Sequence, residues 1–220
     1  MSTISETTGA DGAATAIDRE RAGRVAGLCA GPLFLTLVCV LTIAERGMLH
    51  RYGWTYLTSN EIPWPSGLSL GSYGEFQIAN FAATGILLLV FTRGLKPQLR
   101  GVTGRIAVVL LAVQACALAA SAVRADHQMM LGHSPATWNG YVHDVAFFFV
   151  AIPSLLAPIF VGLALRRTVT WQRLGVVSLA VPILLVGAFA SQSAVGGLGF
   201  TAFLVVVFGW VALLARRLGR

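Results

Sequence analysis

Residues 74–123 read GEFQIANFAATGILLLVFTRGLKPQLRGVTGRIAVVLLAVQACALAASAV. Two apolar runs, near 74–95 and 104–123, stand on either side of a short segment that carries several cations. Each run is close to the ~20 residues that cross the hydrocarbon core of a bilayer. A backbone in lipid must satisfy its own hydrogen bonds, so both runs are predicted to be helices. The stretch therefore predicts two transmembrane helices joined by a basic connection.

The same pattern extends over most of the chain. Of its 220 residues, 56% are hydrophobic and 11% are charged, whereas a soluble domain carries about 25% charged residues. The fold class that follows is all-α, an integral membrane bundle of six transmembrane helices. Their expected spans are 23–44, 74–95, 104–123, 141–165, 174–193 and 197–215.

The positive charges predict the orientation of the bundle. Thirteen of the sixteen Lys and Arg flank one set of helix ends, and only Arg46, Arg51 and Arg124 lie at the other. Under the positive-inside rule, this asymmetry places both termini in the cytoplasm. The net charge of +7 then needs no nucleic-acid partner, because basic residues at cytoplasmic helix ends are attracted to the anionic lipids of the inner leaflet. We expect a multi-pass protein of the cell membrane with lipids as partners and no nucleic-acid partner.

Two parts are expected along the chain. Residues 1–22 are polar and lack the apolar core of a signal peptide, so they are predicted to be a disordered cytoplasmic tail. Residues 23–215 form the six-helix transmembrane domain. Cys29, Cys39 and Cys116 fall inside predicted helices, so neither a disulfide nor a paired-cysteine metal site is indicated.

Five residues are candidates for ligand binding, on long outer connections at 45–73 and 124–140 or in the helices near them: Trp54, Trp64, Asn80, Gln114 and Trp138. The aromatic residues of the first loop either line a folded cap over the bundle or belong to an interfacial belt. Asn80 and Gln114 are polar side chains at membrane depth. Each either lines a site or makes a hydrogen bond between helices.

Acidic and histidine side chains gather where the third and fourth helices meet the outer surface. Asp126 follows the third helix, and His143 and Asp144 are expected to open the fourth. These three are the candidate catalytic residues, and we expect Asp126 and His143 to lie within one side-chain contact or one bridging water. They could work as an acid/base pair or, with His127, as ligands of a zinc-type metal. The alternative is structural, since an Asp near a helix start favours the helix dipole. Neither a metal nor a cofactor is specified by the pattern.

Three short motifs resemble the prokaryotic membrane family known as domain of unknown function 998. They are Gly-Leu-Cys-Ala-Gly-Pro at 27–32, Leu-Gly-Ser-Tyr-Gly at 70–74 leading into Asn-Phe at 80–81, and Asp126 followed by Thr-Trp-Asn-Gly at 137–140 and His-Asp at 143–144. The usual Asp-Pro of the family is Asp-His in this chain. The resemblance implies a bacterial or archaeal six-helix protein and brings no assigned activity.

Two functions remain open at this point. The first is an integral membrane protein whose outer-facing Asp/His site binds a lipid or a small apolar ligand. The second is a membrane-embedded enzyme, of lipid hydrolase or cyclase type, that uses the same residues. No acid or histidine is expected deep in the bilayer, which argues against a proton relay across the membrane.

The predicted topology can be tested by cysteine-accessibility labelling. Cysteines at Trp54 and at Gln98 should be labelled from opposite sides of the membrane, because the connections that contain them lie at opposite helix ends. Labelling of both positions from the same side would refute the six-helix arrangement.

Overall fold

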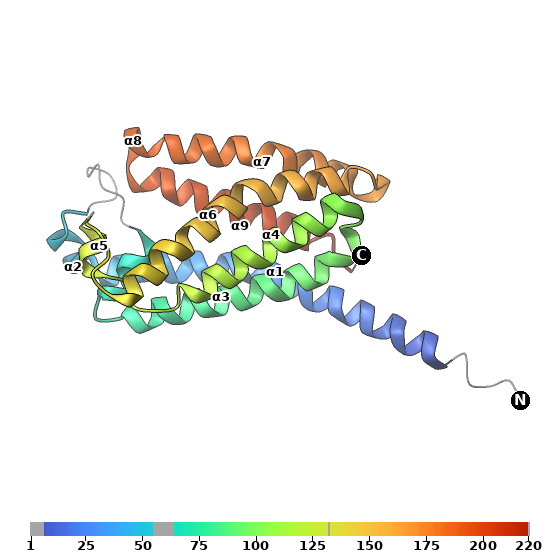
Figure 1. The fold of residues 1–220 in the computed structure, drawn as a ribbon, viewed down its shortest axis with the longest axis horizontal. Helices are drawn as coiled ribbons and strands as arrows, with labels where there is room; N and C mark the ends of the chain where they lie inside the picture. Colours follow the sequence, from blue (N-terminus) through green and yellow to red (C-terminus); the bar gives the residue numbers. More distant parts are fainter. Residues whose placement is uncertain (1–6, 55–63, 132, 220) are drawn as a thin grey trace, which may run out of the picture.

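The computed structural model describes residues 7–54, 64–131 and 133–219. Within these ranges the chain is helical and contains no strand, and six helices are long and apolar enough to cross a membrane. The predicted fold class is confirmed. The six helices, which run roughly along one axis in Figure 1, are α1 (Thr7–Ala44), α3 (Gly74–Leu95), α4 (Gly101–Ala120), α6 (Trp138–Leu165), α7 (Gln172–Ala190) and α9 (Gly197–Ala215).

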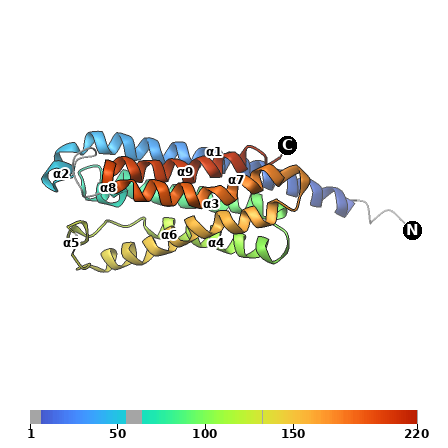
Figure 2. The same cartoon turned by 90° about the horizontal axis from the view of Figure 1, so that it is seen from above.

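The six long helices form a closed ring in chain order. Each packs against the helix before it and the helix after it, and α9 closes the ring against α1. Seen from above, α4 and α6 lie together along one side of the molecule, with α1, α9 and α7 on the other (Figure 2). The ring can also be described as three antiparallel hairpins, α1/α3, α4/α6 and α7/α9.

At least one side-chain hydrogen bond joins the two helices of each hairpin. Asn80 Nδ2 of α3 donates to the Phe34 carbonyl of α1 over 3.2 Å. Gln114 Nε2 of α4 donates to Ser154 Oγ of α6 over 2.8 Å. Trp210 Nε1 of α9 donates to Ser178 Oγ of α7 over 2.9 Å. Bonds of this kind contribute ~0.6–2 kcal/mol each between membrane helices.

Glycines form close contacts between hairpins. A Cβ added to Gly85 of α3 would lie 2.7 Å from the Ala115 carbonyl of α4, and one on Gly31 of α1 would lie 2.8 Å from Phe208 of α9. Gly162 of α6 is equally close to Leu179 of α7. Helices in lipid associate through such close packing because no hydrophobic effect drives them together.

The two ends of the bundle differ. The N-terminal part of α1 and the end of α9 lie at one end (Figure 1), together with η2 (Lys96–Gln98) and η3 (Val169–Trp171). We name this the basic end. The other end, named the loop end, carries α2 (Arg46–Arg51), η1 (Pro65–Leu70), α5 (His127–Met130) and α8 (Gln192–Val195). The exposed Ser72 and Lys96 are better labelling positions than Trp54, which is buried.

Several helix boundaries differ from the expected ones. Helix α4 spans Gly101–Ala120 rather than 104–123, and α7 spans Gln172–Ala190 rather than 174–193. The fourth long helix begins at Trp138 rather than at 141, so His143 and Asp144 lie in its second turn and do not open it. Helix α1 begins at Thr7, before the domain boundary expected at residue 23. Solution disorder of residues 1–22 stays a prediction.

The described part of the first long loop packs onto the bundle. Trp54 and Leu68 are buried and belong to the hydrophobic core. Trp64 makes edge-to-face contacts with Phe147 of α6 and Phe200 of α9, at centroid distances of 5.4 and 4.9 Å. These rings connect the described part of the loop to two hairpins. Residues 55–63 of the loop lie outside the described residues, so the folded cap stays a prediction.

The contact between Gly23 and Gly94 gives a test of the packing within the first hairpin. A Cβ at Gly23 would lie 2.7 Å from Gly94 Cα, so Gly23→Ala forces two backbones apart and should destabilise the protein by about 1–3 kcal/mol. The control is Gly187→Ala, where nothing lies within 4 Å. It should leave stability unchanged or raise it by up to ~1 kcal/mol. Thermal unfolding in detergent measures both, and equal effects would contradict the packing.

Candidate functional site

The carboxylate of Asp126 accepts four hydrogen bonds from nearby residues at the loop end. Its Oδ2 accepts hydrogen bonds from the Ala136 N–H, the Thr137 N–H and the Thr137 hydroxyl, at 2.9, 2.7 and 2.7 Å. Its Oδ1 accepts from the Gln128 N–H at 2.8 Å. The side chain is only 3% exposed, so these donors replace the water that a carboxylate otherwise binds.

These bonds stabilise the ionised carboxylate. The Thr137 hydroxyl contributes most, and the backbone N–H groups of Gln128, Thr137 and Ala136 add to it, so the pKa of Asp126 falls from 3.8 to about 2. Burial acts in the opposite direction but is the weaker effect overall. Asp126 is therefore a permanent anion at physiological pH and a poor general base.

Asp126 is linked through Thr137 to the start of α6. Thr137 is the N-cap residue, and its Oγ1 accepts from the Gly140 N–H at 3.2 Å. Gly140 packs directly on the carboxylate, since an added Cβ there would lie 2.6 Å from Asp126 Cβ. The Thr-x-x-Gly part of the motif thus supplies a cap and the space that Asp126 occupies.

His143 and Asp144 have different surroundings. His143 is buried and its Nε2 donates to the Val123 carbonyl at 2.8 Å, while its ring contacts Phe81. Asp144 is half-buried on another face of α6. No hydrogen bond between Asp126 and His143 is recorded for the described residues. Both side chains instead hold the segment after α4 against α6, and their closer approach through water stays a prediction.

Two other histidines at the loop end, His127 and His133, are engaged separately. His127 Nδ1 is hydrogen-bonded to the Tyr52 hydroxyl, and His133 Nδ1 donates to Gln128 Oε1 at 3.1 Å. Burial raises the pKa of Tyr52, with the charge of Arg51 opposing it. Over the described ranges, no three His, Cys, Asp or Glu side chains are placed to hold a metal ion together. The metal hypothesis therefore has no geometric support in these ranges.

The five ligand-binding candidates are dispersed. Asn80 and Gln114 make the interhelical bonds described above, with Asn80 also bonded to Gln77 and Thr84. Trp54 is buried and stacks on Tyr52 at 4.9 Å. Trp64 joins the first long loop to α6 and α9. Trp138 is 78% exposed, and it is the one of the five that borders the groove described next.

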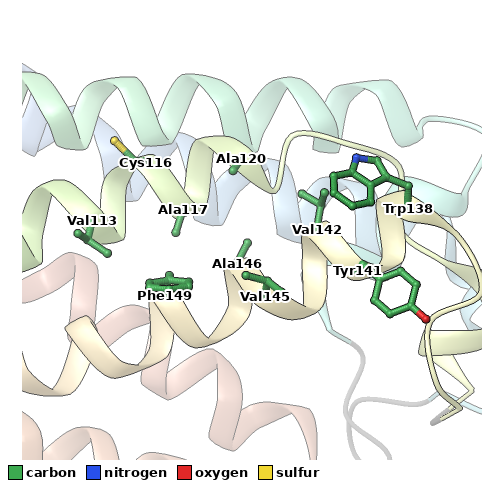
Figure 3. Close-up of a pocket in the computed structure, with 10 residues that line it drawn as sticks. All are labelled: Val113, Cys116, Ala117, Ala120, Trp138, Tyr141, Val142, Val145, Ala146 and Phe149. Atoms are coloured by element: carbon green, nitrogen blue, oxygen red, sulfur yellow. The ribbon is translucent and has the colours of Figure 1, made fainter.

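An apolar groove of about 450 Å³ runs between α4 and α6 in the half of the bundle nearest the loop end. Its floor is made by the buried methyl groups of Ala117 and Ala146. Trp138 and Tyr141 stand at the loop end of the groove (Figure 3). The remaining lining residues are Val113, Cys116, Ala120, Val142, Val145 and Phe149.

Most residues of the groove were missed by sequence reasoning. The lining residues contributed by α6 recur at helical spacing, at positions 138, 141, 142, 145, 146 and 149. Those contributed by α4 recur in the same way, at 113, 116, 117 and 120. Such stripes are visible in the sequence, but every membrane helix shows similar ones. Only the packing of the two stripes against each other distinguishes this pair.

The Asp126 hydrogen bonds predict a specific pH dependence. Because the folded-state pKa of about 2 lies below the ordinary 3.8, the stabilisation by the carboxylate is complete above about pH 4 and is lost as pH falls through about 2. Asp126→Asn should therefore lower the melting temperature in detergent by several degrees at neutral pH, and the difference from wild type should shrink below pH ~4. Asp144→Asn is the control and should change little. A difference that is the same at every pH would contradict this role of the charge.

Comparison with known proteins identifies the family of the chain. No curated protein and no solved structure matches it. The family model described as a protein of unknown function, DUF998, matches residues 65–217. This segment includes five of the six long helices, Asp126 with its hydrogen-bond partners, and both walls of the groove. The six-helix bundle described above therefore belongs to the domain of unknown function 998 family of membrane proteins.

Proposed function

We propose that this protein binds a membrane lipid, with one hydrocarbon chain of the lipid lying in the groove between α4 and α6. The groove itself carries the proposal. Its volume of about 450 Å³ falls within the ~300–1,000 Å³ of small-molecule sites. Its lining contains no charged side chain, so it suits a hydrocarbon chain rather than a polar solute.

The ends of the groove suit an amphiphile. Phe149 and Val113 lie at the deep end, toward the middle of the two helices (Figure 3). At the loop end, Trp138 and Tyr141 each combine an apolar ring with a hydrogen-bond donor, and such rings favour the membrane interface. A lipid would place its chain along the alanine floor and its ester or headgroup oxygens beside these two rings.

The Asp/His residues fit this proposal as structural supports. Every recorded partner of the Asp126 carboxylate is a donor in the segment 128–137, and the recorded partner of His143 Nε2 is a backbone carbonyl. A general base or nucleophile needs an oxygen or nitrogen directed at a substrate. The lipid-binding function is therefore better supported than the hydrolase or cyclase alternative.

The location of the site follows from the charge pattern. We place the loop end on the outside of the cell membrane, because the basic end carries most of the cations. The groove would then receive a lipid of the outer leaflet, and the bound lipid could be exchanged laterally with the bilayer.

A phospholipid with a photoreactive group in its chain can test the proposal. At limiting lipid in detergent, crosslinks should map to the groove faces of α4 and α6. Ala120→Phe places a ring in the groove from an exposed position. Displacing two or more buried CH₂ groups at ~0.8 kcal/mol each should weaken binding about tenfold or more.

The matched control is Ala79→Phe, at an exposed position on α3 outside the groove. It should leave crosslinking of the groove unchanged. Uniform labelling of all lipid-facing helices, with no effect of Ala120→Phe, would refute a specific lipid site.

A further inference from the structure

We propose that Asp126, acting through Thr137, is the positioning residue for the mouth of the lipid groove. The inference rests on the proposed lipid-binding function and assigns to Asp126 a role in that site. It is carried by a continuous chain of contacts from a buried carboxylate to an exposed aromatic ring.

The first link joins Asp126 to Thr137. Two of the bonds to Oδ2 come from this one residue, one from its N–H and one from its hydroxyl, both at 2.7 Å. A two-point attachment fixes the direction of the Thr137 side chain as well as its place. The third bond to Oδ2, from the Ala136 N–H, fixes the backbone just before it.

The second link joins Thr137 to the first turn of α6. Its Oγ1 gives one hydrogen to Asp126 and accepts one from the Gly140 N–H. A hydroxyl can do both at once, whereas an apolar side chain of the same shape can do neither. The first turn of a helix has free N–H groups, so it depends on such a cap for its order.

The third link joins the first turn of α6 to the mouth of the groove. Trp138 directly follows the cap and Tyr141 lies one turn later, so both rings are carried by the turn that Thr137 holds. The two side chains are exposed, at 78% and 53%, and little packing restrains them. Their positions over the groove therefore depend on the backbone beneath them, which is anchored to the buried Asp126.

Thr137→Val and Thr137→Ser separate positioning from general stability. Valine keeps the size and branching of threonine but loses the hydroxyl, while serine keeps the hydroxyl. Fluorine NMR of fluorotryptophan-labelled protein in detergent reports on each Trp, and the Trp138 resonance is identified by its loss in Trp138→Phe. The probe is dioleoyl phosphatidylglycerol, titrated into the detergent-solubilised full chain.

Wild type and Thr137→Ser should show a saturable shift of the Trp138 resonance. In Thr137→Val this resonance should move before lipid is added and require about tenfold more lipid for its shift, while the resonances of the buried Trp171 and Trp210 stay in place. Asp126→Asn should repeat the effect, and it replaces Thr137→Val if that variant does not fold.

An unchanged Trp138 resonance and an unchanged lipid requirement in both variants would overturn the inference but leave lipid binding intact. Failure of lipid binding itself has a different signature. In that case the Trp138 resonance of wild type would not shift saturably, and Ala120→Phe would behave like wild type.

Discussion

The hydrocarbon core of a bilayer offers no water, so a polar group between helices is stabilised by a partner within the protein. This constraint explains how the bundle is assembled. Each hairpin contains at least one bond that satisfies a buried donor, from Asn80, Gln114 or Trp210. Between hairpins, glycines bring backbones and small side chains close together. Denser polar contacts occur at the loop end, where the chain leaves the long helices.

Much of the architecture could be predicted from the sequence, because long apolar runs and clustered cations are local signals. The number and approximate span of the long helices are confirmed by the structure. The predicted start of α6 was wrong, although the bond that caps the helix, from the Gly140 N–H to Thr137, is local. Thr137 is held by a carboxylate 11 residues earlier in the chain, and the polar residues that follow it resemble a loop. Orientation in the membrane rests on charge alone and stays a prediction.

The candidate site was less predictable, for two physical reasons. Residue type drew attention to Asp126 and His143, but the partners of both include backbone groups, which no pattern of side chains reveals. The groove depends on which faces of two helices meet. Ala117 and Ala146 are unremarkable in sequence, and they form a floor only because α4 and α6 bring them together. For Asn80 and Gln114 the sequence left two roles open, lining a site or bonding between helices. The structure shows both residues in hydrogen bonds between helices.

The packing of Gly140 on Asp126 has a consequence for how this sequence can diverge. A methyl group at Gly140 would lie 2.6 Å from Asp126 Cβ and 2.7 Å from its Oδ2, so a larger residue at 140 is tolerated only after the residue at 126 has become smaller or moved. The two positions are thus epistatic, and the order of substitutions matters. In an alignment of related chains, glycine at 140 should accompany aspartate at 126 and vary where that aspartate is replaced.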